Sequence, residues 1–142
     1  MATKKVCPHT ITLFNYMGED ESGRASYSQT LINHVHYRDG LAVASLHTPA
    51  DSVRLHVFDD TAYTSKPYMD YDDWKTLSMQ EKQVRWTLPP PAQDGGSDYF
   101  GLGDLRTGDT SLPTQHPLFR ITKSARCQMG RRRMWHWRID AR

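Results

Sequence analysis

Two histidines and two groups of acids are the residues whose types suit metal-dependent chemistry. His34 and His36 flank one residue in the segment HVH, so an extended chain places both imidazoles on one face, close enough to bind the same ion. Acids gather at Asp59 and Asp60 and again at Asp70, Asp72 and Asp73. Paired carboxylates can hold Mg²⁺ in a nuclease, so these residues together outline a metal-dependent hydrolase.

That outline lacks essential parts. Zinc takes three or four ligands, and none of the other histidines is spaced to join the HVH pair. No base stands at a recognised spacing from the acids, and no phosphate-binding glycine loop, nucleophile elbow or His-Glu metalloprotease helix is present. We therefore expect no enzyme, no metal and no cofactor, and keep a hydrolase that uses His34 and His36 as the weakest hypothesis.

The C-terminal stretch GRRRMWHWRIDAR combines three tandem arginines with two tryptophans. In an extended strand Trp135 and Trp137 share a face with Ile139 and Ala141, so this strand is predicted to turn its indoles toward a core. The arginines before it stand at a hairpin tip that reaches solvent. The candidate contacts to DNA phosphates or to a neighbouring subunit are Arg131, Arg132, Arg133 and Arg138. A solvated basic turn is the alternative.

Residues 89–117 are rich in Gly, Pro, Asp, Ser and Thr and predict an extended loop or arm. Compact domains rarely keep so long a connection without a use, such as binding a partner or reaching a neighbour. The apolar anchors in this segment are Tyr99, Phe100, Leu102 and Leu105. They are the candidate subunit-interface residues, although docking on the parent domain explains them equally well.

Composition predicts one domain over residues 1–142 with a modest core, because 142 residues suit a single core and only 37% are hydrophobic. The formal charge of +2 hides a strong polarity. Residues 118–142 hold eight Lys and Arg against one acid, whereas the first 117 hold ten basic and fifteen acidic side chains. Such asymmetry favours an electrostatic partner for the basic end, either nucleic acid or the acidic face of another copy.

The two cysteines, Cys7 and Cys127, lie too far apart for a disulfide scaffold or a zinc motif, which favours a reducing compartment. No apolar stretch approaches the length of a membrane span, and the first residues, MATKKVCPHT, contain no hydrophobic signal core. We expect a soluble protein made in the cytoplasm, without a membrane partner.

Alternation of apolar and polar residues predicts a mainly β fold, a small barrel or sandwich of six to eight strands. The predicted strands are TITLFNY, SYSQTLINHVHYRDG, LAVASL, DSVRLHVFDD, VRWTLPPP, PLFRITKSARC and RRMWHWRIDAR, with an exposed turn at MGEDESGRA. At most one short helix is expected, over residues 73–83. In DSVRLHVFDD the inward residues are Val53, Leu55 and Val57, and Phe58 is expected to face outward.

The second predicted strand carries the HVH pair, so its faces matter for that hypothesis. Strict alternation groups Thr30, Ile32, His34 and His36 on one face and Leu31, Asn33, Val35 and Tyr37 on the other. The pair Asp39-Gly40 then predicts a hairpin turn into the next strand.

The order of these segments resembles a known group of proteins. The words TITLFNYMG, TLINHVHY, RLHVF, W-T-L and FRITKSARCQMGRRRMWHWRI, with the acidic turn between the first two, are similar to small structural proteins of prophages and tailed phages of Gram-positive bacteria. The wider resemblance is to head-completion or stopper proteins of the head-tail connector.

The resemblance implies a β-barrel subunit of the virion, assembled in the bacterial host cytoplasm. Such a subunit forms a homo-oligomeric ring between portal or adaptor and tail proteins, and the ring continues the channel for the packaged DNA. The long segment 89–117 departs from a compact stopper and leaves a tail terminator or another minor virion protein open. A free nucleic-acid-binding barrel that uses the arginine cluster is the alternative of another class.

Overall fold

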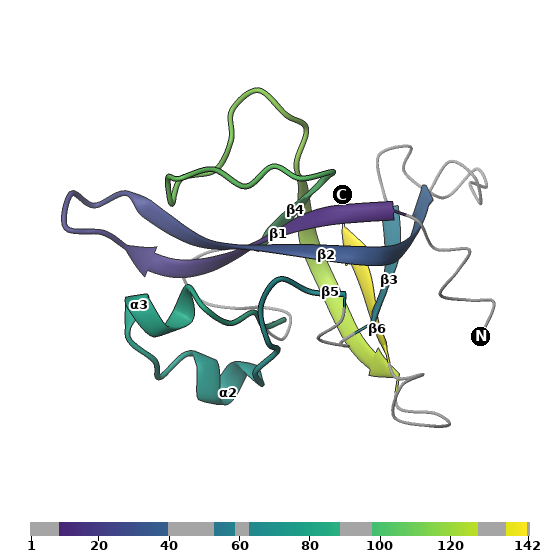
Figure 1. The fold of residues 1–142 in the computed structure, drawn as a ribbon, viewed down its shortest axis with the longest axis horizontal. Coiled ribbons are helices and arrows are strands. Elements are labelled where there is room, and N and C mark those ends of the chain that lie inside the picture. Colours follow the sequence, from purple (N-terminus) through teal and green to yellow (C-terminus); the bar gives the residue numbers. More distant parts are fainter. Residues whose placement is uncertain (1–8, 40–52, 59–62, 89–97, 128–135, 142) are drawn as a thin grey trace.

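The computed structural model describes residues 9–39, 53–58, 63–88, 98–127 and 136–141. Within them the chain forms six strands and two one-turn helices (Figure 1). The strands are β1 (His9–Glu19), β2 (Ala25–Asp39), β3 (Val53–Phe58), β4 (Tyr99–Leu102), β5 (Phe119–Cys127) and β6 (His136–Ala141). The helices are α2 (Tyr71–Trp74) and α3 (Met79–Lys82). The predicted mainly β class is confirmed.

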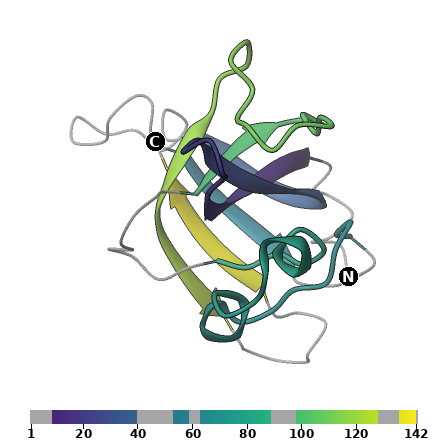
Figure 2. The same ribbon diagram turned by 90° about the vertical axis from the view of Figure 1, so that its left-hand side faces the viewer.

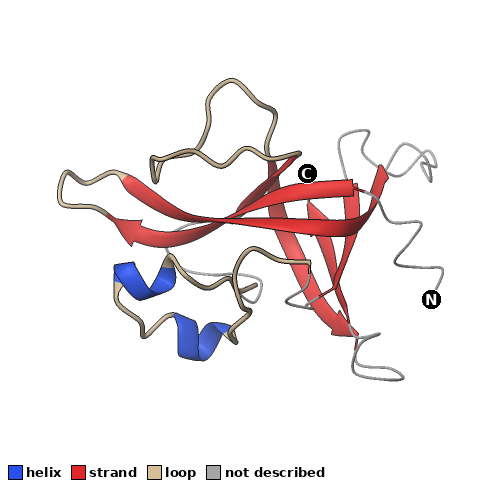
Figure 3. Ribbon diagram, viewed as in Figure 1, coloured by secondary structure: helices blue, strands red, loops and turns tan. Residues whose placement is uncertain are grey.

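The strands pair in the order β1-β2-β3-β6-β5-β4, and β4 returns to β1, so the sheet closes into an antiparallel barrel (Figure 3). β4 completes the ring through four residue pairs with β1, from Ile11↔Leu102 to Phe14↔Tyr99. Its other edge joins β5 through Tyr99↔Arg120 and Phe100↔Phe119. Closure gives each strand two neighbours within the barrel, although β2 pairs with β3 only from His36 to Asp39.

Three local predictions need correction. Residues 99–102, expected in a loop, form β4. The helix expected over 73–83 is two helices: α2 ends at Trp74, and α3 begins after its N-cap Ser78, whose Oγ accepts from the Glu81 N–H at 3.2 Å. VRWTLPPP is not a strand among the described residues, since Trp86 makes only an isolated bridge to Tyr68. The predicted strand LAVASL lies outside the described residues.

The first hairpin extends well beyond the barrel. β1 pairs with β4 only as far as Phe14, so residues 15–19 and the opposite residues 25–28 project as a hairpin arm (Figure 1). The turn at its tip closes through a bond from the Asp20 N–H to the Arg24 carbonyl at 2.8 Å, with Gly23 at a φ of +84°. In Figure 2 the two helices and the segment after β4 lie on opposite sides of this arm.

A β-bulge interrupts the alternation of β2. The register steps from His9↔Val35 to Ile11↔Ile32, so Asn33 and His34 together oppose one residue of β1. His34 adopts a φ of 57°, a conformation that non-glycine side chains rarely take. As a consequence Ile32 and Val35 are both fully buried. The prediction that they occupy opposite faces is therefore wrong.

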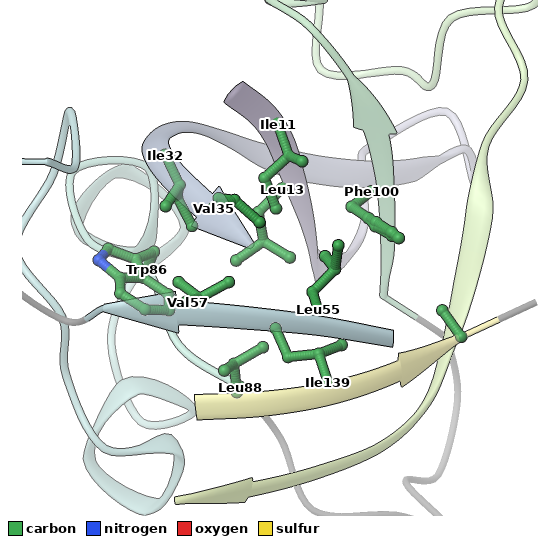
Figure 4. Packing of buried hydrophobic residues seen from close by; sticks show 11 residues of the cluster. Ile11, Leu13, Ile32, Val35, Leu55, Val57, Trp86, Leu88, Phe100 and Ile139 are labelled. Atoms are coloured by element: carbon green, nitrogen blue, oxygen red, sulfur yellow. The ribbon is translucent and has the colours of Figure 1, made fainter. Parts of the chain in front are cut away.

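Aliphatic and aromatic side chains that point inward fill the barrel (Figure 4). The fully buried members of this barrel core include Ile11, Leu13, Ile32, Val35, Leu55, Val57, Trp86 and Phe100. In β6, Ile139 and Ala141 are buried and Trp137 packs against the same cluster, as their shared face predicts. Trp135 lies outside the described residues. Phe58, expected to face outward, is buried with 4% of its surface exposed.

Candidate functional site

The outer edge of β2 creates the most distinctive polar surface of the described fold. β2 pairs with β3 only from His36 to Asp39, so residues 25–35 need other partners along that edge. Two segments supply them. The Tyr27 N–H donates to the Thr110 carbonyl at 2.8 Å, whereas the Ser65 N–H donates to the Leu31 carbonyl at 2.9 Å. The Leu31 N–H in turn donates to Ser65 Oγ at 2.9 Å.

Gln29 lies midway between these two attachments. Every second residue of a strand turns its backbone groups to the same side, so the N–H and C=O of Gln29 point along the edge as those of Tyr27 and Leu31 do. Its side chain fastens the loop above: Nε2 donates to the Asp109 carbonyl at 2.6 Å, and Oε1 accepts from the Thr107 N–H at 2.7 Å. Within the described part of the chain, no backbone segment pairs with Gln29 at this edge, which lies below a fixed loop.

A solvent-accessible hollow of about 220 Å³ lies at this opening, and we call it the edge hollow. Strand β2, the segment 63–68, the end of α3 and the loop after β4 meet around it. Its lining residues are Tyr27, Ser28, Gln29, Lys66, Gln83, Arg106, Thr107, Gly108, Asp109 and Thr110.

Lys66 and Arg106 bring positive charge to the edge hollow, and Asp109 brings negative charge. Lys66 Nζ donates to Ser28 Oγ at 3.1 Å, and no carboxylate within the described segments forms an ion pair with it. Burial, followed by the nearby Arg106, lowers the pKa of Lys66 to about 8. Its ammonium is therefore partly desolvated, and within the described segments no carboxylate pairs with it.

The acids beside the edge hollow already have partners. Arg106 grips Asp104 with a fork of two bonds, Nε to Oδ1 and Nη2 to Oδ2, both 2.9 Å long. The pKa of the Asp109 carboxyl is lowered by hydrogen bonds, first from the Ser111 side chain and then from the Ser111 backbone nitrogen, 3.2 Å from Oδ1. The arrangement therefore offers donors and positive charge to a ligand that brings hydrogen-bond acceptors and negative charge.

A second polar cluster lies inside the hairpin arm and holds it to the chain around it. Asn15, fully buried, donates through Nδ2 to the Thr87 carbonyl and to Asp98 Oδ2, both at 2.8 Å. Asn15 Oδ1 accepts from the Thr87 N–H at 3.2 Å, and Asp98 Oδ1 accepts from the Tyr16 N–H at 2.9 Å. Burial outweighs these bonds and raises the pKa of Asp98 to about 6.

The arginine cluster predicted from the sequence is only partly within the described structure. Arg131, Arg132 and Arg133 lie outside the described residues. Arg138 lies in β6, where its backbone position pairs with His56 of β3 and Ala125 of β5. Whether these arginines contact DNA or protein stays a prediction.

The histidines and acids of the hydrolase hypothesis are not brought together among the described residues, where no three His, Cys, Asp or Glu side chains gather as metal ligands. The His34 ring lies against Tyr63, with 4.4 Å between ring centroids, and His36 pairs in register with His56. Asp72 and Asp73 are exposed in the first turn of α2, preceded by Asp70. Asp59 and Asp60 lie outside the described residues.

The predicted interface anchors have different environments. Phe100 is fully buried and stacks on Phe119 at 5.2 Å, and Tyr99 meets Tyr27 edge to face at 6.1 Å. Leu105 packs with Leu118 over Gly101, where a β-carbon would have no room. Leu102 is 45% exposed. Docking on the parent domain therefore accounts for Phe100 and Leu105, and the interface role stays a prediction for Leu102.

Sequence reasoning did not find the edge hollow. Lys66 contacts Ser28, 38 positions away, and Gln29 contacts Thr107, 78 positions away, so no spacing along the chain relates them. The one local signal is Asp104 followed two residues later by Arg106 in a glycine-flanked turn, a pattern that suits a short-range ion pair.

None of the helices in the described part of the chain has the length and apolar character to cross a bilayer. No curated protein and no solved structure matches the chain. A family match extends over residues 6–142 of the 142 residues. The chain therefore belongs to DUF6751, a family of unknown function.

Proposed function

We propose that this chain is a non-enzymatic structural subunit of a tailed-phage virion. In this proposal it forms the ring of a neck or stopper protein in the head-tail connector, between portal or adaptor and tail proteins. It assembles in the bacterial host cytoplasm and lines the DNA channel of the virion. The sequence resemblance suggests the particle, and the closed barrel with its projecting hairpin arm is the observation that supports assembly.

The hairpin arm carries an acidic tip far from the strands that continue into the basic end of the chain. Glu19 and Glu21 are exposed there, and Asp20 turns back to bond Ser22 and Arg24. Figure 1 shows the tip at one end of the long axis and β3, β5 and β6 in the other half. β5 and β6 flank the segment with the three tandem arginines. The strands that precede and follow the arginine segment thus lie away from the acidic tip.

Separated complementary surfaces favour head-to-tail contacts between copies. A contact of this kind uses two different patches, and it produces a ring when the rotation between neighbours closes. The acidic tip of one copy would meet the basic end of the next. Arginines left facing the lumen would contact DNA through its phosphates alone, which suits a genome of arbitrary sequence.

Sedimentation velocity and light scattering on the full chain test this proposal. We expect closed oligomers at low salt that dissociate at high salt and that are lost in Glu19→Lys/Glu21→Lys. The matched control is Asp72→Lys/Asp73→Lys, which reverses two equally exposed acids in α2. Reversing Arg131 and Arg132 to Glu in the tip variant should restore assembly, because the opposite charges then face each other again.

Two outcomes would overturn the proposal. The first is a monomer at every concentration and salt tested. The second is loss of assembly in the control pair as well as in the tip pair, which would show a general charge effect. If the monomer instead binds duplex DNA with steep salt dependence, and alanine at the three tandem arginines flattens that dependence, the nucleic-acid-binding barrel replaces the virion subunit.

A further inference from the structure

The edge hollow has the features of a small anion site, and they begin with its backbone. The attachments of Tyr27 to Thr110 and of Leu31 to Ser65 bracket a single opening along the β2 edge. Gln29 turns its backbone N–H into that opening by the alternation of the strand. The sheet holds the Gln29 backbone, and the bonds of the Gln29 side chain to the loop hold it as well. The N–H is therefore pre-organised for an acceptor.

Charge adds to this geometry from both walls. Lys66 reaches the opening from the segment 63–68, and Arg106 reaches it from the loop after β4. Arg106 donates one Nε–H and one Nη2–H hydrogen bond to Asp104, and its guanidinium has further N–H donors. The Lys66 ammonium donates one hydrogen bond to Ser28 Oγ and has further N–H donors as well. Asp104 is bound by Arg106 itself, and Asp109 accepts from the Ser111 N–H, so both carboxylates have partners within the chain.

The dimensions suit one compact group. A volume of about 220 Å³ accommodates a phosphate or a carboxylate with part of its carrier, but it is small for a drug-sized ligand. An ammonium that is half buried without an anion costs desolvation free energy, and a bound anion would offset that cost.

We propose that the edge hollow binds an oxyanion, a phosphate or carboxylate group, held by Lys66, Arg106 and the backbone N–H of Gln29. This site is separate from the acidic tip and from the basic end, so it goes beyond the proposed assembly. Failure of either proposal leaves the other standing.

The test is a titration of the ¹⁵N-labelled full chain with inorganic phosphate, and separately with acetate, against chloride at equal ionic strength. Saturable shifts are expected at the amides of Gln29 and Gly108. Lys66→Met and Arg106→Gln should each weaken binding about tenfold, as expected when a hydrogen bond to a charged group is lost. Lys75→Met is the control, because its side chain is 52% exposed and pairs with Asp72 on α2, outside the hollow.

Dependence on pH gives a second readout. Of the titratable groups that line the hollow, the pKa of Tyr27 is raised from 10.0, that of Arg106 is raised and that of Asp109 is lowered from 3.8. Lys66 is the group that titrates near pH 8. Affinity should therefore fall as the pH rises through this value in the unchanged chain, and Lys66→Met should lose that dependence.

Each titration and each variant either supports or overturns the proposed anion site. Tighter binding of phosphate or of acetate identifies which oxyanion the site prefers, and either supports the proposal. The proposal is overturned if neither anion shifts the hollow amides more than chloride does, or if both variants bind as tightly as the unchanged chain. Arg106→Gln changes a side chain that is 42% exposed, so it remains decisive even if Lys66→Met fails to fold.

Discussion

The barrel and the hairpin arm share two strands but have interiors of opposite chemistry. Where β1 and β2 line the barrel, their inward residues are aliphatic, such as Leu13 and Ile32. Further along the same strands, polar residues are buried beside Met17 and Tyr27, with Asn15 fully buried and Ser26 and Ser28 nearly so. The barrel interior excludes water without directional bonds, whereas the arm interior depends on hydrogen bonds between specific atoms.

This difference shows how a strand pair can serve two purposes. Apolar packing has little directional preference, so a barrel core specifies size and pattern more than a unique partner for each side chain. A buried hydrogen-bond network fixes register, because each donor must meet its own acceptor or lose free energy. In the arm, the contacts of Asn15 with Thr87 and Asp98 join three segments that are distant in the sequence.

The largest effect is expected in the barrel, from Phe100→Ala. Phe100 is fully buried, stacks on Phe119 and lies on the strand that closes the ring. Truncation of a buried phenylalanine leaves a cavity and lowers the free energy of unfolding by about 3–5 kcal/mol. Chemical denaturation measures this loss. Leu102→Ala on the same strand is the control, since Leu102 is 45% exposed, and an equal loss there would contradict the inward placement of Phe100.

A slightly smaller loss, about 3 kcal/mol, is expected in the arm from Asn15→Leu. The leucine retains similar volume but leaves the Thr87 backbone groups and the Asp98 carboxylate without the bonds that Asn15 gives them. The matched barrel change, Leu13→Met, conserves volume among apolar neighbours and should cost less than about 1.5 kcal/mol. If denaturation finds the two substitutions equally tolerated, the proposed contrast between the two interiors is wrong.

The ionisation of Asp98 makes the stability of the fold depend on pH in a direction unusual for a carboxylate. Burial raises its pKa from 3.8 to about 6, so the folded chain binds the proton more tightly than the unfolded chain does. Stability should therefore be higher below pH 4 than above pH 6 on account of this group, by roughly 3 kcal/mol at most. Asp20, Asp104 and Asp109 have pKa values lowered from 3.8, so their effect on stability has the opposite sign. The stability that they contribute is lost as the pH falls below that value.

Thermal unfolding of the chain and of Asp98→Asn between pH 4 and pH 7 isolates this contribution. The difference in stability between the two proteins should change across the interval, with the variant gaining relative to the unchanged chain as the pH rises. Groups that titrate equally in both proteins cancel in this comparison. A constant difference over the whole interval would mean that Asp98 is not desolvated in the folded chain.

The strands with clear alternation were predictable and the closing strand was not. β1, β2, β3, β5 and β6 lie where alternating runs placed them. β4 has only four residues, two of them Gly101 and Phe100, and it lies between glycine-rich segments, so no periodicity marks it. Its place is decided by two distant neighbours, β1 and β5. The bulge at His34 was equally hidden, since a histidine at positive φ has no sequence signal.

The polar sites were beyond prediction for a related reason. Asn15 and Asp98, like Lys66 and Ser28, are ordinary residues until folding brings together segments separated by 83 and 38 positions. The sequence does indicate that the region around Asp104 and Arg106 is a turn. It contains no indication that this turn covers the edge of β2.

The smallest effect on stability is expected in α3, whose C-cap residue Gln83 lines the edge hollow. Ser78 caps this helix: its Oγ accepts from the Glu81 N–H, and the Glu81 side chain accepts in return from the Ser78 N–H. Ser78→Ala should lower the free energy of unfolding by about 1 kcal/mol, because water can replace part of an exposed cap. The loss should be well below that of Asn15→Leu, although each change removes hydrogen bonds to backbone groups. Denaturation of both variants under one set of conditions compares them, and equal losses would mean that burial is not what makes the arm network strong.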